Sequence, residues 1–208
     1  MAARRRLNLE TIPGLLASGM VAGLVLSAAA IAAWLVVRPR VVTGPGTPSA
    51  ATDAAAAAAT LAHAEELRGR RLEVPVEGIA RERLVDTFDD RRTGHIHEAA
   101  DIMAPRNTPV RAVEAGTIAR LLSNPSGGNT IYQLDPTERF VYYYAHLERY
   151  ADGLRQGQKV DRGQVIGYVG TSGNAPKNTP HLHFAIFRVA DQRQWWSGTS
   201  VNPYLVLR

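Results

Sequence analysis

The segment NTPHLHFAIFR carries His181 and His183, two of the six histidines in this 208-residue chain. Side chains alternate between the two faces of a β-strand, so these two imidazoles would point the same way. Leu182, Phe184 and Ile186 would point the other way, toward a core. Such a pair can serve a metal ion or a substrate. Taken alone, the segment favours a half-buried strand whose polar face carries two imidazoles, because short histidine patterns recur by chance.

A second candidate for metal or acid–base chemistry is the segment RTGHIHEAAD. His97 and Asp101 are four residues apart, so in extended backbone they share a face unless a turn intervenes. An ordinary polar edge loop would give the same spacing. His95 precedes them, and we interpret it as a rim or surface histidine rather than a ligand.

The third candidate is the aromatic segment VYYYAHLERY. Strand alternation places His146 on the same face as Tyr142 and Tyr144. The two tyrosines either line a groove or pack against the core, and Tyr144 is our candidate for a substrate contact. Asn174, in the loop that leads to His181, is predicted to border the same cleft.

Composition narrows the chemistry further. The formal net charge is +5 and the sequence pI is about 9.9, without a long basic stripe interleaved with aromatic residues, which argues against nucleic acid. The positive charge is compatible with a protein that acts on or binds an acidic polymer. The chain has no cysteine, so disulfides, thiolate metal sites and a cysteine nucleophile are excluded. Any metal must be bound by histidines and carboxylates.

The N-terminal part is predicted to anchor the chain in a membrane. Residues 14–37 carry no charge and, as a helix, would span about 36 Å, enough for a hydrocarbon core of about 30 Å. Arginines flank this span, and the positive-inside rule favours a cytoplasmic tail at 1–13 and an exported remainder. A cleaved signal peptide is the alternative. The length of the span, with Trp34 and Arg38 as interfacial residues, favours a retained transmembrane helix.

Two further parts follow. Residues 38–72 are predicted to be a Gly- and Pro-rich linker and then an Ala-rich helical stalk, solvated rather than core, with Asp53 as a possible N-cap. In 73–208, short β-branched or apolar runs alternate with Gly, Asn, Pro and Asp turns. This pattern predicts an all-β domain, a sandwich or partly closed barrel of antiparallel strands. Five of the six histidines lie in it.

Three longer segments occur in order: HEAADIMAPRNTPVRAVEAGTI, YYYAHL and LRQGQKVDRGQVIGYVGTSGNAPKNTPHLHFAIF, followed by VNPYLVL. Together they resemble the lysostaphin-like (LytM-type) zinc endopeptidases, which cut peptide bridges in bacterial cell walls. The first resembles the family's H-x-G-x-D motif and the Ala-Pro-x-Gly-Thr-Pro-Val turn that follows it. The second resembles its Tyr-x-His-Leu strand, and the third its Gly-rich hairpin and H-x-H strand. The likeness runs from about Val74 to Tyr204.

This resemblance implies roles for five residues. His97, Asp101 and His183 would be zinc ligands, and His146 and His181 would be the unligated catalytic histidines. Two imidazoles and a carboxylate are a normal catalytic zinc set, which leaves the fourth position for a water whose pKa falls to about 7. A histidine with an ordinary pKa of about 6.5 can act as the base or stabilise the transition state, and the sequence assigns neither role to one histidine in particular.

Two glycines of the family pattern are replaced here. Asn107 stands at the glycine of the Ala-Pro-x-Gly turn, and asparagine suits a left-handed backbone. Ala99 stands at the glycine of H-x-G-x-D, where alanine would be strained if the backbone needs a positive φ.

We therefore interpret the chain as an exported, membrane-anchored zinc metallopeptidase. Its expected substrates are the stem-peptide cross-links of peptidoglycan, cut as by a D,D-endopeptidase, outside the cytoplasm. Two alternatives belong to other classes: a non-catalytic LytM-like regulator that activates a cell-wall amidase, and a peptidoglycan-binding module. The complete set of implied ligands favours catalysis.

Overall fold

The computed structural model describes residues 50–189 and 198–208, which belong to one compact unit that spans 45–208. The predicted tail and membrane span, at 1–37, lie outside the described residues. Among the helices that are described, none combines the length and the apolar character needed to cross a membrane.

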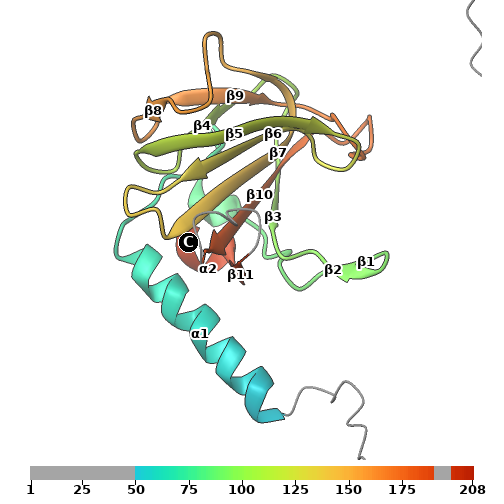
Figure 1. The fold of residues 1–208 in the computed structure, drawn as a ribbon. Helices are drawn as coiled ribbons and strands as arrows, with labels where there is room; N and C mark the ends of the chain where they lie inside the picture. Colours follow the sequence, from blue (N-terminus) through green and yellow to red (C-terminus); the bar gives the residue numbers. More distant parts are fainter. Residues whose placement is uncertain (1–49, 190–197) are drawn as a thin grey trace, which may run out of the picture. The chain divides into compact units, whose positions relative to one another are not determined.

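The described part of the chain forms eleven strands, two α-helices and a single 3₁₀ turn (Figure 1). In chain order they are α1 (Ala50–Arg68), the 3₁₀ turn (Arg81–Arg83), β1 (Arg91–Arg92), β2 (His95–Ile96), β3 (Ala100–Met103), β4 (Pro109–Arg111), β5 (Gly116–Asn124), β6 (Gly128–Leu134), β7 (Phe140–Tyr150), β8 (Lys159–Val160), β9 (Val165–Val169), β10 (His181–Arg188), β11 (Thr199–Val201) and α2 (Pro203–Leu207).

All strand pairings in the described residues are antiparallel. Nine of these strands form one sheet with the order β11-β10-β7-β6-β5-β8, to which β3 is added on β10, and β9 with β4 on β7. Strands β1 and β2 form a separate hairpin. The prediction of an all-β domain built from antiparallel strands is confirmed.

The long strand β7 divides the sheet into two arms. One of its edges pairs with β6. The other edge pairs with β10 from Phe140 to Ala145 and then with β9 from Leu147 to Tyr150. In Figure 1, β4, β8 and β9 accordingly lie at one end of the domain, and β3, β10 and β11 at the other. The change of partner falls at His146, the only residue of β7 between the two pairings.

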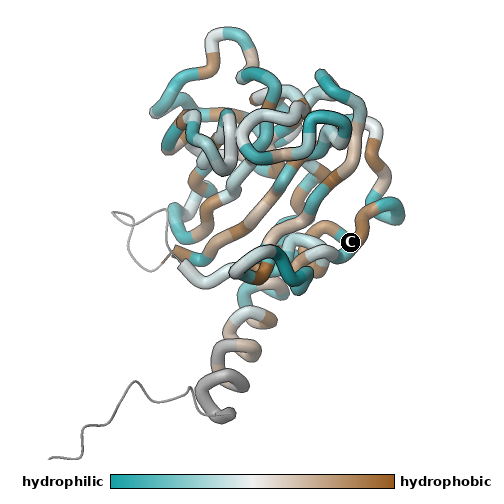
Figure 2. The backbone as a smooth tube through the Cα atoms, turned by 90° about the vertical axis from the view of Figure 1, so that its right-hand side faces the viewer, coloured by the Kyte–Doolittle hydropathy of each residue, from teal (hydrophilic) through white to brown (hydrophobic). Residues whose placement is uncertain are grey.

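The hydrophobic residues concentrate on the strands and the hydrophilic ones on the connecting loops, as Figure 2 shows. The sheet packs its apolar side chains into one core, which draws on both arms. The largest side chains without exposed surface there include Ile118, Ile131, Phe140, Tyr142, Tyr144, Leu147, Ile166, Leu182, Phe184 and Ile186.

Helix α1 differs from the predicted solvated stalk. Asp53 lies within α1, so it is not the N-cap. Its last two turns belong to the core, because Ala64 and Leu67 are 2% and 0% exposed. Leu61, one turn earlier, is 57% exposed. The sequence offered few apolar anchors in this run, but Ala64 and Leu67 lie one helical turn apart and pack into the core, and Arg68 donates to the carbonyl of Leu205.

Candidate metal centre

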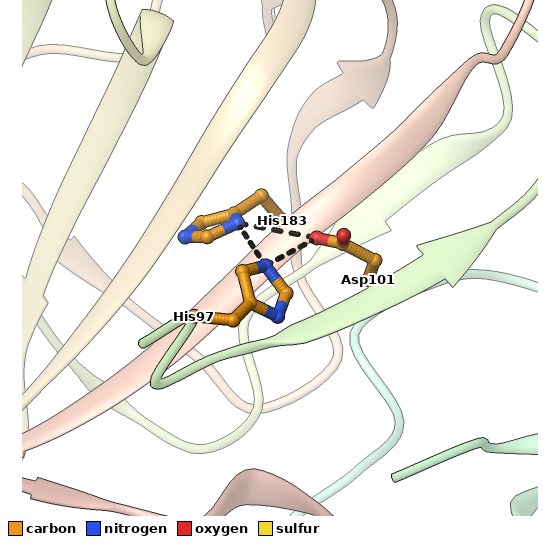
Figure 3. A group of neighbouring side chains, drawn as sticks. All are labelled: His97, Asp101 and His183. Atoms are coloured by element: carbon orange, nitrogen blue, oxygen red, sulfur yellow. Dashed lines mark hydrogen bonds and ion pairs between the residues drawn. The ribbon is translucent and has the colours of Figure 1, made fainter. Parts of the chain in front are cut away.

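Three side chains bring one ligand atom each to a common point (Figure 3). The Nε2 atom of His97 lies 3.0 Å from Oδ1 of Asp101 and 3.0 Å from Nδ1 of His183. Nδ1 of His183 lies 3.1 Å from the same carboxylate oxygen. The three atoms therefore form a nearly equilateral triangle. His97, Asp101 and His183 are the residues for which the sequence predicted a ligand role.

The size of this triangle suits a small divalent cation. A tetrahedral zinc ion with bonds of about 2.0–2.1 Å holds its ligand atoms about 3.3 Å apart. The observed separations of 3.0–3.1 Å are close to one face of such a tetrahedron.

Hydrogen bonding directs lone pairs toward the same point. The backbone carbonyl of Thr87 can only accept, so Nδ1 of His97 donates to it, at 2.8 Å. In the neutral imidazole this leaves a lone pair on Nε2. The lone pair faces the carboxylate of Asp101 and Nδ1 of His183. Three acceptor groups thus converge where a cation would satisfy them, and the residues fit a bound zinc ion.

Charge on Asp101 supports the same conclusion. Burial raises the pKa of its carboxyl, but the interactions with the imidazoles of His183 and His97 outweigh burial and hold the pKa far below the usual range. Burial lowers the pKa of His183, and the hydrogen bond to Asp101 offsets this only in part. At neutral pH the centre therefore combines an ionised carboxylate with a neutral His183 imidazole. Burial lowers the pKa of His97, but the hydrogen bonds to Asp101 and Thr87 outweigh burial and raise the pKa, so a metal would displace a proton from that ring.

Pairing between β10 and β3 places two of the ligands. His183 lies directly opposite Asp101 in this antiparallel pair. Leu182, Phe184 and Ile186 are completely buried, as the alternation of the segment predicts. The other face of β10 carries the two histidines at its N-terminal end, and this end of the strand lies at the metal centre.

His97 reaches the centre from the loop after the β1–β2 hairpin. Its backbone N–H donates to Asp90 and that of Glu98 to Phe88, so the loop is fixed on both sides of the ligand. Glu98 adopts a φ of +53°, and Ala99 has no positive φ and is fully buried. The left-handed residue is therefore the one before Ala99, and alanine at the family's glycine position is not strained.

His146 joins the site through an irregularity in β7. It has a φ of +61°, and the pairing of β7 with β6 shifts register between Tyr144 and Leu147. This β-bulge turns His146 to the face of Tyr143 and Ala145 rather than to that of Tyr144. The predicted alternation, which grouped His146 with Tyr142 and Tyr144, is therefore wrong at this position.

The prediction of a substrate contact for Tyr144 is also wrong. Its side chain has no exposed surface, and its hydroxyl donates to Oε1 of Gln133 and accepts from the backbone N–H of Val113. Tyr142 is likewise completely buried. Tyr143 instead faces the site, with its ring edge-on to His183 at 6.0 Å between centroids.

A cavity of about 600 Å³ surrounds these side chains and is open to solvent. Strands β7 and β10 contribute Tyr143, Ala145, His146, His181 and His183. The remaining lining residues are Arg92, Thr93, His95, His97, Asp101, Ser126, Gly127, Asn174, Ala175 and Pro176. Asn174 lies at the cavity as predicted, and a substrate contact for it stays a prediction. His95 is exposed at the rim, in agreement with its interpretation as a rim histidine.

The two remaining histidines are oriented by backbone carbonyls. Nδ1 of His146 donates to the carbonyl of Ser172 at 2.9 Å, and Nδ1 of His181 to that of Thr179 at 2.8 Å. In both rings Nε2 is therefore the nitrogen available on the cavity side. Nε2 of His181 lies 3.8 Å from Oδ1 of Asp101. Burial, followed by the neighbouring His183 and His181, lowers the pKa of His146 to about 4 despite the bond to Ser172.

Sequence reasoning missed Thr87 and Tyr143. The hydroxyl of Thr87 donates to the carbonyl of Ala99 and accepts from the N–H of Asp101, while its carbonyl holds His97. A threonine in a loop gives no signal of such a role. Tyr143 was missed because the bulge after it is not visible in the alternation. Asn107, at the other replaced glycine, has a φ of +69°, as expected.

The fold and the donor set are those of a metallopeptidase domain, and comparison with known proteins gives the family. The model of peptidase family M23 matches residues 95–203, so the chain belongs to this family of zinc-dependent peptidases.

Three relatives show the range of the family. The chain is 37% identical over 126 residues to the L-Ala–D-Glu endopeptidase of Bacillus subtilis, a match that covers 58% of this chain and 36% of that protein. It is 36% identical over 92 residues to lysostaphin of Staphylococcus staphylolyticus, a match that covers 44% of this chain and 18% of lysostaphin. It is 32% identical over 108 residues to the peptidoglycan DD-endopeptidase ShyC of Vibrio cholerae, a match that covers 49% of this chain and 24% of ShyC. The chain thus spans about a third or less of these relatives.

Solved structures show the same fold. Csd3 of Helicobacter pylori superimposes with a TM-score of 0.51 and 26% identity, over 66% of this chain and 33% of that one. A peptidase M23 of Pseudomonas aeruginosa gives a TM-score of 0.50 at 25% identity, over 66% and 50% of the two chains.

Proposed function

We propose that this protein is a zinc-dependent endopeptidase that hydrolyses the peptide cross-links of bacterial peptidoglycan. The observation that carries the proposal is the triangle of ligand atoms from His97, Asp101 and His183, together with two further histidines whose Nε2 atoms are left for the same cavity. The ligand set is complete, which favours catalysis over a regulatory or wall-binding role.

Binding of the substrate is assigned to the open cavity. This cavity is lined by residues of β7 and β10, of the β1–β2 hairpin and of the segments 126–127 and 174–176, and we assign an extended peptide to it. Tyr143 and Asn174 are the lining residues best suited to contact it, one through an aromatic ring and the other through an amide.

His97, Asp101 and His183 would hold zinc, which supplies Lewis acidity to polarise the scissile carbonyl and to acidify water. His146 and His181 provide proton transfer. Because Nδ1 of each ring donates to a carbonyl, Nε2 is the atom that exchanges protons with the substrate. One of them takes a proton from the attacking water, and a protonated imidazole returns a proton to the leaving amine as the C–N bond breaks.

His146 is suited to the role of base by its protonation state. Its pKa of about 4 keeps the ring neutral at neutral pH, so a lone pair is available on Nε2. His181, as an imidazolium that also carries a proton on Nε2, is then the candidate for stabilising the developing oxyanion, since it lies beside the ligand Asp101.

The bond cut is proposed to be the D,D cross-link between stem peptides. The likeness to the DD-endopeptidase ShyC supports this choice, whereas the relative from Bacillus subtilis is named for a bond between L-Ala and D-Glu. These two bonds lie at different places in the stem peptide, so the masses of released fragments distinguish them.

The test uses the full-length chain, purified in detergent, loaded with zinc and incubated with cross-linked sacculi. Mass analysis of the muropeptides should show dimers converted to monomers by the parent chain and not by His97→Ala or His183→Ala. His95→Ala, a change at the rim of the cavity, serves as the matched control and should keep the activity.

A parent chain that binds zinc and leaves every dimer intact would overturn the proposed activity and favour the amidase-regulator alternative. Binding to sacculi that survives zinc removal, without cleavage, would favour the wall-binding alternative.

We also propose that the enzyme is anchored by residues 14–37 with its peptidase domain outside the cytoplasm. The uncharged span and its flanking arginines support this location. Protease added to intact spheroplasts should digest the C-terminal domain and spare a cytoplasmic control protein. Protection of the C-terminal domain in intact cells, with digestion only after lysis, would contradict it.

A further inference from the structure

Asp101 has one carboxylate oxygen at the metal position and one that is held elsewhere. Oδ1 lies 3.0 and 3.1 Å from the two histidine nitrogens. Oδ2 accepts a hydrogen bond of 2.9 Å from Nη2 of Arg92. The two oxygens of one carboxylate thus have separate partners, and the partner of the second oxygen is a permanent cation.

Arg92 is brought there by the β1–β2 hairpin. It pairs with His95 across the hairpin, and the chain continues from β2 directly into the ligand His97. The same short element therefore sets the position of one ligand and the guanidinium that contacts another. Arg92 also lies 3.5 Å from Asp90 and lines the cavity, with 41% of its side chain exposed.

The chemical consequence concerns the number of atoms that Asp101 offers to the metal. A free carboxylate can bind a cation through one oxygen or through both. A catalytic zinc site keeps three protein ligand atoms and an open fourth position, and a second oxygen from Asp101 would compete for that position. A charge-assisted hydrogen bond to Oδ2 opposes such a change, because the bond would have to be lost.

We infer that Arg92 is a positioning residue of the metal centre, which holds Oδ2 of Asp101 so that only Oδ1 is directed at the metal. This inference rests on the proposed zinc-dependent function. It gives the hairpin β1–β2 a role beyond contributing lining residues to the cavity. It also distinguishes Arg92 from Arg91, whose side chain points to the opposite face of the same strand.

The alternative is that Arg92 acts only through its charge, and the two roles predict opposite signs. A cation near the site repels zinc, so removing a mere charge would strengthen zinc binding. Losing the partner of a coordinating carboxylate instead weakens metal binding by about 10–100-fold.

The experiment compares the full-length parent chain with Arg92→Met, Arg92→Lys and, as the matched control, Arg91→Met. The dissociation constant for zinc is measured by competition with a chromophoric chelator. We expect Arg92→Met to bind zinc about 10–100-fold more weakly than the parent and Arg91→Met to match the parent. Arg92→Lys keeps a donor and the charge and should recover most of the affinity. Because Arg92 is partly exposed on a two-stranded hairpin, the core is not disturbed, and thermal unfolding of the metal-free chains should coincide.

Cobalt in place of zinc reports the coordination number directly. Four-coordinate Co²⁺ gives intense visible d–d bands and five-coordinate Co²⁺ much weaker ones. The parent, Arg91→Met and Arg92→Lys should show intense bands. Arg92→Met should show weaker ones, because Asp101 can then offer both oxygens.

Two results would overturn the inference: zinc binding by Arg92→Met that equals or exceeds that of the parent, or weaker binding with an unchanged cobalt spectrum. Neither measurement needs a cell-wall substrate. A chain that binds both metals as expected but cuts no cross-link would therefore overturn the proposed activity and leave the role of Arg92 standing. A parent chain that binds no zinc would overturn both.

Discussion

Nε2 of His97 lies 3.0 Å from Nδ1 of His183, although 86 positions separate the two histidines in the chain. Each comes from a different kind of element. His97 is in a loop fixed by the carbonyl of Thr87, and His183 is in the middle of the sheet. Their approach forms the metal centre, and Asp101 completes it from the neighbouring strand β3.

The first prediction concerns the three ligands. His183→Ala should reduce zinc affinity by more than the roughly 10–100-fold that is typical of an outer-shell partner, because a donor atom itself is lost. Competition with a chelator measures the effect. His95→Ala removes an imidazole from the rim of the same cavity and should bind zinc as the parent does. Equal loss of affinity in both variants would show that the wrong histidine has been assigned to the metal.

The second prediction tests the tie between Thr87 and Asp101. Thr87→Val keeps the shape of the side chain and the carbonyl that holds His97, but it removes the hydroxyl that bridges Ala99 and Asp101. We expect zinc affinity to fall by about 10-fold. The free energy of unfolding of the metal-free chain should fall by about 1 kcal/mol. Thr93→Val, on the exposed hairpin, is the control. Unchanged zinc binding in Thr87→Val would show that the backbone alone positions Asp101.

The third prediction separates the two adjacent tyrosines. Tyr144→Phe leaves the buried groups of Gln133 and Val113 without a partner, so the free energy of unfolding should fall by about 1–3 kcal/mol. Turnover per folded molecule should stay unchanged, because Tyr144 does not reach the cavity. Tyr143→Ala should impair cleavage of cross-links. If Tyr144→Phe lost turnover while its stability stayed unchanged, Tyr144 would contact the substrate after all, although its side chain is buried.

The fourth prediction is a pH dependence of stability from His146. Its folded-state pKa of about 4 lies below the ordinary value of about 6.5, so the unfolded chain binds this proton first as the pH falls. The stabilisation is complete above pH 6.5 and is lost as the pH drops toward 4, by up to roughly 3 kcal/mol.

His146→Asn is the reference variant for this measurement, because asparagine is neutral and tolerates the φ of +61°. Chemical unfolding of both metal-free chains between pH 7 and pH 4 gives the difference in stability at each pH. The advantage of the parent should shrink as the solution becomes more acidic. A constant difference over this range would mean that His146 titrates with an ordinary pKa.

The fifth prediction addresses the replaced glycine. Ala99 has no positive φ, so Ala99→Gly relieves no strain and increases the freedom of the unfolded chain. We expect a loss of about 0.4–1 kcal/mol in the free energy of unfolding and no gain in zinc affinity. Unfolding in denaturant and chelator competition measure the two quantities. Tighter zinc binding in Ala99→Gly would indicate that alanine distorts the backbone between His97 and Asp101.

Regular alternation explains which parts of the site were predictable. The strand β10 pairs without interruption along its histidine segment, so a period of two placed His181 and His183 on one face and the apolar residues in the core. The same rule failed for β7, because the bulge at His146 inserts an extra residue between Tyr144 and Leu147. Nothing local to that segment shows the insertion. The family motif pointed to His146, which lines the cavity, but it could not show which neighbouring side chains share that face.

The amino-acid sequence by itself determined the kinds of ligand available, the antiparallel all-β class and the face of β10 that carries histidines. These follow from residue type and from alternation along a single strand, which are local properties. The tertiary structure alone decided that His183 lies opposite Asp101, that Thr87 ties His97 to the same centre, and that Arg92 holds the second oxygen of Asp101. Register, bulges and loop closure depend on pairing between segments far apart in the chain, and no local pattern records them.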